Sequence, residues 1–223
     1  MSIESLERRI YNCPYINSKE CKYRFKCRPI PGYGSTHPKF LVIGINPALR
    51  QGVWKQYEKT QKALQEKYFD ECRKYGYGVL LRELAQEIPE FDIPDTVYLT
   101  DIVRCPTVNG LPSPEMIKQC TAAYLEETVK LLNPKTIIAF GQTTANQVQY
   151  LQNQGIRIIP ARHPSRASDV PSIAKEIKQL LFLIDNVKPR KVFVSDSAMS
   201  TNVLSTNVPP SKKCLWTGNG FMD

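Results

Sequence analysis

The segment Lys39 to Arg50, KFLVIGINPALR, decides the fold, because a short apolar run in it ends abruptly in a polar turn. Phe40 to Ile43 is a continuous apolar run, as in a parallel strand that is covered on both faces. Gly44 then lets the backbone leave the sheet, and Pro47 biases Asn46 toward extended geometry. The segment predicts a buried strand with an amide at its carboxyl end, although an ordinary turn uses the same residue types.

Three further stretches have the same apolar, β-rich character and alternate with amphipathic segments. The predicted strands are Phe40 to Ile43, Thr96 to Asp101, Lys135 to Phe140 and Arg157 to Ala161. The predicted helices are Ile3 to Tyr11, Glu58 to Lys74, Val79 to Ile88, Ser113 to Leu132, Thr144 to Gln154 and Ser172 to Asn186, with a break at Gly76 and Gly78. This alternation predicts an α/β fold, with three α/β/α layers around a central four-stranded parallel sheet.

Length and composition favour one globular domain followed by a tail. The chain has 223 residues, 42% of them hydrophobic, and no apolar run long enough to cross a bilayer, so we expect a soluble protein that does not contact membranes. We expect a domain over residues 1–187 and a tail over 188–223, where Ser, Thr, Asn and Pro dominate. Leu215, Trp216 and Phe221 would attach the end of this tail to the domain or to a partner.

The N-terminus and the net charge bear on compartment and partner. MSIESLERRI lacks the apolar core of a secretory signal, so we expect a cytoplasmic protein that is not secreted. We also expect it to be a monomer. Lys and Arg number 30 against 21 Asp and Glu, a net charge of +9, which favours a polyanionic partner. Charge alone does not separate DNA from RNA or from a merely basic surface.

Polar side chains follow three of the predicted strands. Asn46 follows the first strand, Asp101 ends the second, and His163 with Ser165 follows the fourth. Because parallel strands have their carboxyl ends at one edge, we expect these side chains to converge, and ligands of open α/β sheets bind at that edge. His163 is one of two histidines, and a lone histidine is often structural; we place the other, His37, on the surface.

These residues resemble the motifs of the uracil-DNA glycosylase superfamily over about Cys13 to Ile184. Gly44-Ile45-Asn46-Pro47 is similar to the first motif, in the form of the mismatch-specific thymine/uracil branch, and His163-Pro164-Ser165 is similar to the second. The stretch from Thr100 to Pro106, Cys120 and the stretch from Pro134 to Gly141 resemble the iron–sulfur branch. Each motif alone is weak, whereas their order and spacing together are fairly specific.

The resemblance implies hydrolysis of the N-glycosidic bond of a base flipped out of DNA. By this resemblance His163 donates to the base oxygen on which negative charge develops, and Asn46 positions the water or the base edge. Arg166, after Ser165, would fill the vacated stack or bind phosphate, unless it is simply solvated. Trp54 or Tyr57 would stack on the base, unless they belong to the core; we prefer Trp54. A nucleoid-associated repair enzyme whose tail binds a repair protein fits this interpretation.

Asp101 departs from the pattern of the superfamily. Uracil-reading branches often carry asparagine here, whose amide both accepts and donates, whereas an ionised carboxylate only accepts and would repel O4 of uracil. Either Asp101 is protonated or turned away, or the preferred base offers a donor such as an exocyclic amine. Alternatively, Asp101 pairs structurally with Arg104 or Arg162.

Seven cysteines in a reducing compartment favour metal ligands over disulfides, and Cys13 to Pro38 has no periodic pattern of its own. Cys105 and Cys120 match in spacing the pair that ligates a [4Fe–4S] cluster in the iron–sulfur branch. We choose Cys13 and Cys21 as the other ligands, with Cys27 as the alternative to either. Zinc is the second choice, and scattered thiols the third. The cluster would shape a basic surface for the DNA backbone, formed by Lys19, Lys22, Arg24, Lys26 and Arg28.

Three functions compete. The first is a DNA glycosylase acting on uracil or another deaminated or mismatched base in base excision repair. The second is a catalytically altered nucleic-acid-binding protein of the same fold, which Asp101 supports. The third is an unrelated α/β hydrolase or nucleotide-binding protein in which Gly141 to Thr144 holds phosphate, although this segment lacks the P-loop lysine.

Overall fold

The computed structural model describes residues 1–21, 28–47, 60–73, 75–107, 111–164 and 169–186. Its sheet has five strands in the order β1-β3-β2-β4-β5. The strands are β1 (Tyr33–Gly34), β2 (Phe40–Gly44), β3 (Val97–Asp101), β4 (Thr136–Phe140) and β5 (Arg157–Ala161). The four predicted strands are confirmed as parallel neighbours, and the short β1 adds an antiparallel edge beside β3.

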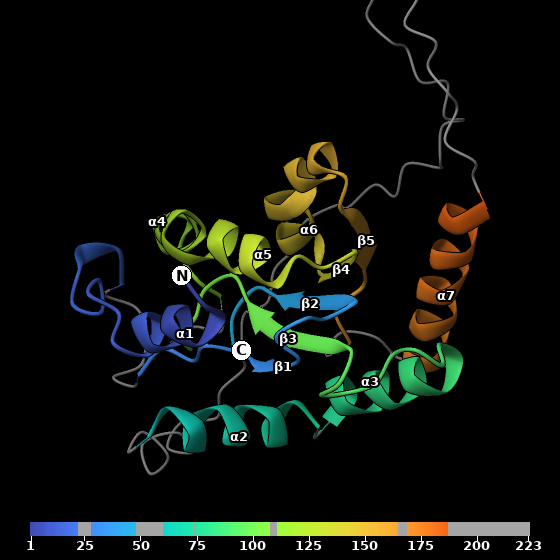
Figure 1. Cartoon of the computed structure of the whole chain (residues 1–223), viewed down its shortest axis with the longest axis horizontal. Coiled ribbons are helices and arrows are strands. Elements are labelled where there is room, and N and C mark those ends of the chain that lie inside the picture. Colours follow the sequence, from blue (N-terminus) through green and yellow to red (C-terminus); the bar gives the residue numbers. More distant parts are fainter. Residues whose placement is uncertain (22–27, 48–59, 74, 108–110, 165–168, 187–223) are drawn as a thin grey trace, which may run out of the picture. The chain divides into compact units, whose positions relative to one another are not determined.

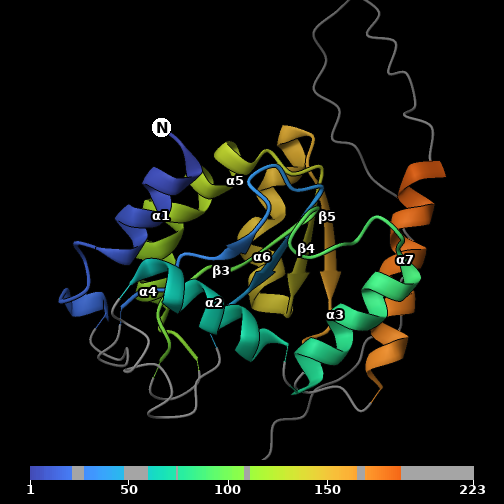
Figure 2. The ribbon, with the colours of Figure 1, turned by 60° about the horizontal axis from the view of Figure 1, so that its bottom comes forward.

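Helices cover both faces of this sheet, which confirms the three-layer α/β/α fold (Figure 1). On one face pack α1 (Ile3–Tyr11), α4 (Pro114–Cys120), the π-helical turn η3 (Thr121–Leu125), α5 (Glu126–Leu132) and α6 (Gln142–Val148). On the other face pack α2 (Gln61–Cys72), α3 (Tyr75–Glu87) and α7 (Val170–Asn186), with α3 and α7 side by side (Figure 2). The 3₁₀ turns η1 (Lys19–Cys21) and η4 (Gln149–Gln154) complete the described elements.

Strand β2 shows why the two cores form. Its side chains point alternately to opposite faces, so Leu41 and Ile43 enter the core beneath α4 and α5, while Phe40 and Val42 enter the core beneath α3 and α7. All five residues of β2 are buried. A strand buried on both faces has to be apolar throughout, which is the pattern that its sequence shows.

Two helix boundaries follow from local chemistry. Ser113 caps α4 by accepting a 3.3 Å hydrogen bond from the backbone N–H of Met116, with Pro114 in the first turn. The helix that this cap opens continues through η3 into α5 and ends at Asn133, whose φ of 46° is left-handed. The predicted helix Ser113 to Leu132 is therefore confirmed, with a π-helical turn in its middle.

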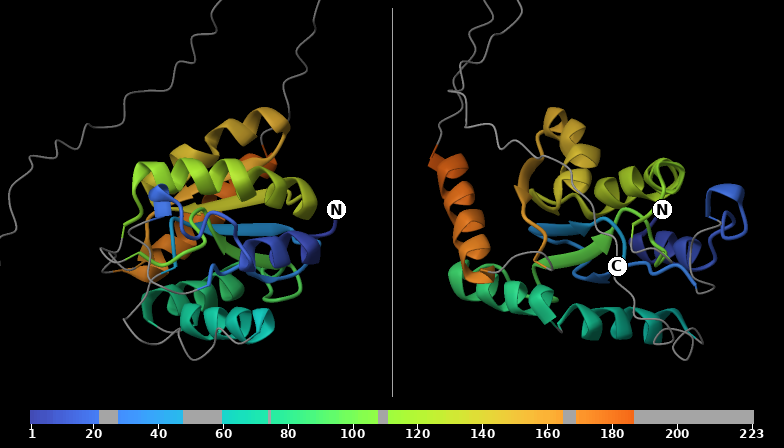
Figure 3. Two further views of the ribbon diagram at one scale, coloured as in Figure 1. Left: turned by 90° about the vertical axis from the view of Figure 1, so that its left-hand side faces the viewer. Right: turned by 180° about the vertical axis from the view of Figure 1, so that it is seen from behind.

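The predicted break at Gly76 and Gly78 is wrong, because both glycines lie within α3. A Cβ on Gly78 would lie 1.9 Å from the carbonyl oxygen of Arg73. The glycine therefore allows the first turn of α3 to approach the end of α2 closely. Figure 3 shows α2 and α3 following one another end to end along one face of the sheet.

Candidate functional site

The carboxyl edge of the parallel strands carries the predicted polar side chains. Asn46 lies two residues beyond β2, Asp101 is the last residue of β3, and His163 lies two residues beyond β5. The register pairs Gly44 with Asp101 and Phe140 with Ala161, so the strands end level with one another. The parallel order of the strands therefore places Asn46, Asp101 and His163 at the same edge of the sheet.

Strand β4 separates the chain segments that carry Asn46 and His163. Because neighbouring strands lie about 4.8 Å apart, β2 and β5 are about 10 Å apart in the sheet. Asn46 and His163 therefore leave the same edge of the sheet on opposite sides of the end of β4.

Thr107 fixes the amide of Asn46, which is half-buried. The Asn46 Nδ2 donates a 3.2 Å hydrogen bond to Oγ1 of Thr107, a buried residue beyond β3. Parallel pairing continues past the strand ends, with Ile102 N–H bonded to the Gly44 carbonyl and Val103 N–H to the Ile45 carbonyl. This extension brings the two loops together and orients the amide. Nothing in the sequence around Thr107 had indicated this role.

Asp101 is a buried carboxyl group held by a phenol. Tyr68 of α2 donates a 2.9 Å hydrogen bond to its Oδ2, and Asp101 is only 7% exposed. Burial raises the pKa of Asp101 from 3.8 to about 6, against the opposing effects of the Tyr68 hydrogen bond and the Arg104 charge. The other oxygen, Oδ1, lies over Gly44, where an added Cβ would come within 2.3 Å of it.

The predicted structural partners of Asp101 have other contacts. The guanidinium of Arg104 donates to the Pro31 carbonyl at 2.7 Å and to Oγ1 of Thr128 at 2.9 Å. Arg162 pairs with Glu176 at 2.9 Å, on the exposed surface. Arg104 acts on Asp101 through its charge, whereas the hydrogen bond to the carboxyl group comes from Tyr68.

Tyr77 of α3 connects the Asp101 side of the edge to His163. Its ring packs edge-on against Phe140 at 5.4 Å between centroids and tilts over the His163 ring at 6.4 Å. The pKa of Tyr77 is raised well above its usual value by burial first, then by the nearby Cys72 and Asp101 charges. Sequence reasoning missed both Tyr68 and Tyr77, because which face of a helix meets the sheet edge is a tertiary property.

The turn after β5 places the half-buried His163 beside β4. The backbone N–H of Gly141 bonds to the Ala161 carbonyl at 2.8 Å. Gly141 has a φ of 89°, and a Cβ there would lie 4.0 Å from Cβ of His163. The positive φ, rather than a lack of space, is what favours glycine at the exit of β4, and the exit lies beside His163.

The remaining predicted site residues divide into two groups. Gly44 and Pro47 are buried, and the partly buried Ile45 packs against the core. Trp54, Ser165 and Arg166 lie outside the described residues, so the predicted stacking, motif and wedge roles stay predictions. Tyr57, the alternative stacking ring, also lies outside them.

The predicted cysteine ligands Cys13, Cys21, Cys105 and Cys120 are all buried, and no disulfide joins them to one another in the described part of the chain. Turn η1, which ends at Cys21, packs against α4, which ends at Cys120. Burial first, and the neighbouring Cys21 and Cys13 after it, raise the pKa of Cys120 to about 11, against the lowering effects of Arg104. Cys21 and Cys13 therefore both lie within electrostatic reach of Cys120.

Within the described ranges, no three His, Cys, Asp or Glu side chains are close enough together to hold a metal ion. The chemistry of the donors nevertheless fits an iron–sulfur cluster, because a cubane separates its four thiolates more widely than a single zinc ion does. Tyr124 lies within electrostatic reach of Cys13 and Cys120.

Residues 31–184 match the model of the Uracil DNA glycosylase superfamily. The chain belongs to this superfamily. The matched segment includes β2, the sheet edge and the turn that carries His163, so the resemblance read from the motifs is confirmed.

Two uracil-DNA glycosylases are similar to the chain. A type-4 uracil-DNA glycosylase of Sulfurisphaera tokodaii is 22% identical over 203 residues, which cover 80% of this chain and 81% of that protein. A type-5 uracil-DNA glycosylase of Pyrobaculum aerophilum is 23% identical over 154 residues, covering 62% of this chain and 66% of that protein. At such identity the shared fold is clear, while the base that is recognised depends on individual side chains.

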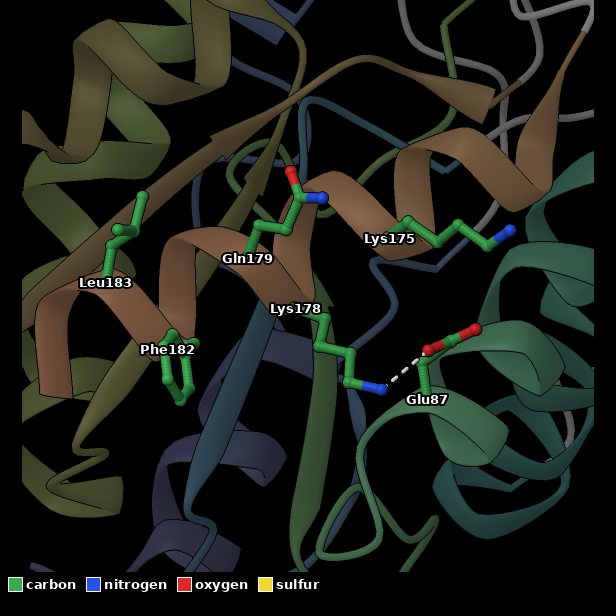
Figure 4. A pocket seen from close by; sticks show the side chains of 6 residues that line it. All are labelled: Glu87, Lys175, Lys178, Gln179, Phe182 and Leu183. Atoms are coloured by element: carbon green, nitrogen blue, oxygen red, sulfur yellow. Dashed lines mark hydrogen bonds and ion pairs between the residues drawn. The ribbon is translucent and has the colours of Figure 1, made fainter. Parts of the chain in front are cut away.

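A groove of about 570 Å³ in this uracil-DNA glycosylase superfamily member lies away from the motif edge (Figure 4). It is lined by Glu87, Lys175, Lys178, Gln179, Phe182 and Leu183 of α3 and α7. Lys178 of α7 forms an ion pair with Glu87 of α3 across the groove, at 2.8 Å between Nζ and Oε2. None of the motif residues contributes to this groove.

None of the described helices is both long and apolar enough to span a bilayer.

Proposed function

We propose that this chain is a DNA glycosylase that hydrolyses the N-glycosidic bond of uracil, or of another deaminated or mismatched base, after the base has been flipped out of DNA. The observation that carries the proposal is the placement of Asn46 and His163 at one sheet edge, two strands apart. Membership of the superfamily and the names of the two relatives support it.

The bond breaks with positive charge on the sugar and negative charge on the departing base. In this proposal His163 donates a hydrogen bond to the base oxygen on which the negative charge develops, and Tyr77 packs against the imidazole. A preorganised donor of this kind is worth about 3 to 4 kcal/mol of the barrier. We therefore expect His163 to lower the barrier to bond cleavage more than Asn46 does.

Asn46 supplies position rather than basicity. An amide is a poor proton acceptor, so it orients a water molecule instead of deprotonating it. With Nδ2 engaged by Thr107, the amide oxygen is the atom that accepts a hydrogen bond from this water. The water then adds to the sugar carbon as the base leaves, and its proton passes to the surrounding solvent or the departing base.

We also propose a [4Fe–4S] cluster on Cys13, Cys21, Cys105 and Cys120, with Cys27 as a replacement for one of the first two. The cluster's contribution is structural: it would tie the N-terminal segment to α4 and to the loop after β3. Four buried thiols support this assignment. Zinc on the same cysteines is the alternative, and iron and sulfide analysis of anaerobically purified protein separates the two.

DNA is the partner that the proposal requires, and the net charge of +9 supports a polyanion. We propose that the protein acts as a monomer in the compartment that holds the DNA. A repair protein that binds residues 188–223 remains part of the proposal.

The second candidate function is a nucleic-acid-binding protein that keeps the fold without the chemistry. The buried carboxyl of Asp101 favours it, because an acceptor at this edge would repel the O4 of uracil. This candidate predicts DNA binding without release of any base.

Oligonucleotides that carry uracil, hypoxanthine, xanthine or a G·T pair test both candidates. Under the first, Asn46→Ala and His163→Ala each lower base release by about 10²-fold or more. His37→Ala and Asn146→Ala are the matched controls, since both residues are exposed and lie outside the site. DNA binding with no base released from any substrate would overturn the glycosylase proposal.

A further inference from the structure

Asp101 and Tyr68 form a hydrogen-bonded pair at the edge where the base would lie, and the catalytic roles proposed above do not use it. The inference drawn from the pair rests on the proposed function, because it concerns which base the same site accepts. The hydroxyl of Tyr68 holds Oδ2 of Asp101 at 2.9 Å. The orientation of the carboxyl group is therefore fixed before any base arrives.

Only Oδ1 is left to meet a base. It lies over Gly44, the first residue of the Gly44-Ile45-Asn46-Pro47 turn, in space that a Cβ on that residue would take. Asp101 also ends β3, immediately beside β2 in the sheet order, whereas β5 and His163 lie on the far side of β4. A ring held between the two would meet His163 on one edge and Asp101 on another.

The chemistry of a carboxylate restricts what it can read. When ionised, its oxygens only accept hydrogen bonds, so a base must present an N–H to it. Uracil presents N3–H, which a carboxylate can accept, but it also presents O4. O4 is itself an acceptor, so the lone pairs of O4 and of the carboxylate oxygen would repel each other. A pyrimidine with an exocyclic amine in place of O4 presents N–H donors at that position. We propose that Asp101 determines base specificity here and that its carboxylate selects a flipped pyrimidine carrying an exocyclic amine over uracil.

The proposal includes a dependence on pH. With Oδ2 held by Tyr68, the proton of neutral Asp101 can lie on Oδ1, which then donates a hydrogen bond to O4 of uracil instead of repelling it. Burial raises the pKa of Asp101 to about 6, so the neutral form is accessible under mildly acidic conditions. Selection against uracil should therefore be strong at pH 8 and should weaken as the pH falls through 6.

The groups that face Asp101 come from several elements. Tyr68 and Cys72 belong to α2, Tyr77 to α3, and Arg104 follows β3. The ordinary pKa values of a thiol and a phenol are 9.0 and 10.0, and burial raises those of Tyr68, Cys72 and Tyr77 above these values. All three groups are therefore neutral over pH 5 to 8. Among these carboxyl, thiol and phenol groups, Asp101 is therefore the one that titrates in this range.

The experiment compares wild type with Asp101→Asn on single-stranded oligonucleotides carrying one cytosine, one 5-methylcytosine or one uracil in the same sequence. The readout is the ratio of the release rates for cytosine and for uracil, at pH 8 and at pH 5.5. The asparagine keeps the shape and supplies an amide donor. We expect this ratio to fall by about tenfold or more in Asp101→Asn at pH 8, because the acceptor-only edge is lost.

The outcomes separate this inference from the proposed function. If both proteins release uracil and Asp101→Asn leaves the ratio unchanged, the inference is overturned and the glycosylase remains. If neither protein releases any base, both are overturned. A wild-type ratio that is independent of pH also contradicts the inference.

Tyr68→Phe provides a second test that does not depend on Asp101→Asn folding. The Tyr68 hydrogen bond lowers the pKa of Asp101, so its removal raises that pKa further. The pH at which the wild-type ratio changes should then move upward in Tyr68→Phe. A midpoint that stays in place or moves downward would show that another group controls selection.

Discussion

The hydroxyl of Tyr68 donates a hydrogen bond to Oδ2 of Asp101 at 2.9 Å, joining helix α2 to the end of strand β3. Both side chains are buried. A carboxyl group in this position affects stability as well as recognition, because its charge is taken out of water whether or not a base is bound. The two effects can be measured separately.

Asp101 should make the folded protein less stable as the pH rises. Its pKa is raised from 3.8 to about 6, so the folded state keeps a proton that the unfolded state releases. The resulting stabilisation is complete below pH 3.8 and is lost as the pH rises through about 6. Asp101→Asn should therefore gain stability relative to wild type at pH 8, on the order of 3 kcal/mol, in urea unfolding. A variant that is less stable than wild type at pH 8 would contradict this account.

Gly44→Ala should displace the Asp101 carboxylate. The new Cβ would lie 2.3 Å from Oδ1, and Tyr68 restrains the carboxyl group from moving away. We expect a loss of about 1 to 3 kcal/mol in urea unfolding, as for other overpacked positions. Combining Gly44→Ala with Asp101→Ala tests the cause, since the overlap is then gone. If the two changes add independently, the predicted contact is wrong.

Arg104 should contribute more to stability than any exposed arginine. It is 1% exposed, bonds to Pro31 and Thr128, and its Nε has no hydrogen-bond partner within the described ranges. Arg104→Ala would leave a cavity and unpaired polar atoms, at a cost of about 3 to 5 kcal/mol in urea unfolding. The control is Arg162→Ala, whose exposed ion pair with Glu176 is worth about 0 to 1 kcal/mol. Equal losses in the two variants would refute the assignment.

DNA affinity should fall linearly with the logarithm of salt concentration and should change little with sequence. Lys19 is exposed in the turn before Cys21, within the predicted basic surface. Lys19→Ala should reduce the salt slope by about one if Lys19 contacts a phosphate. Lys135→Ala is the control, because this exposed lysine precedes β4 and so lies at the opposite edge of the sheet. Equal slopes for wild type and Lys19→Ala would remove Lys19 from the interface.

The sheet could be predicted because burial on both faces leaves a direct trace in the sequence. Phe40 to Ile43 and Ile137 to Phe140 are apolar without interruption, which few structures other than a covered parallel strand require. Strand β1, Tyr33–Gly34, has two residues and therefore no period from which to predict it. The sequence predicts a start of this helix at Val79, whereas α3 begins at Tyr75. Gly78 does not break the helix; it allows close packing against the backbone of Arg73.

The site was predictable only where it follows strand ends. Asn46, Asp101 and His163 inherit their positions from the parallel order of the strands, which the sequence indicates. Tyr68, Tyr77 and Thr107 reach the same edge from helices and from a loop, and their arrival depends on how those elements pack. Such contacts are tertiary, so no local pattern specifies them.

The cysteines allow a direct test of the proposed cluster. Cys120→Ser should abolish the broad absorbance at about 400 nm and lower the iron content, because one of four ligands is lost. Cys72→Ser is the matched control: Cys72 is a partly buried thiol of α2, and its nearby groups include Asp101 and Tyr68 rather than the other cysteines. Both variants are purified without oxygen and assayed for iron, sulfide and zinc. Iron retained in Cys120→Ser, or zinc in place of iron in wild type, would contradict the cluster assignment.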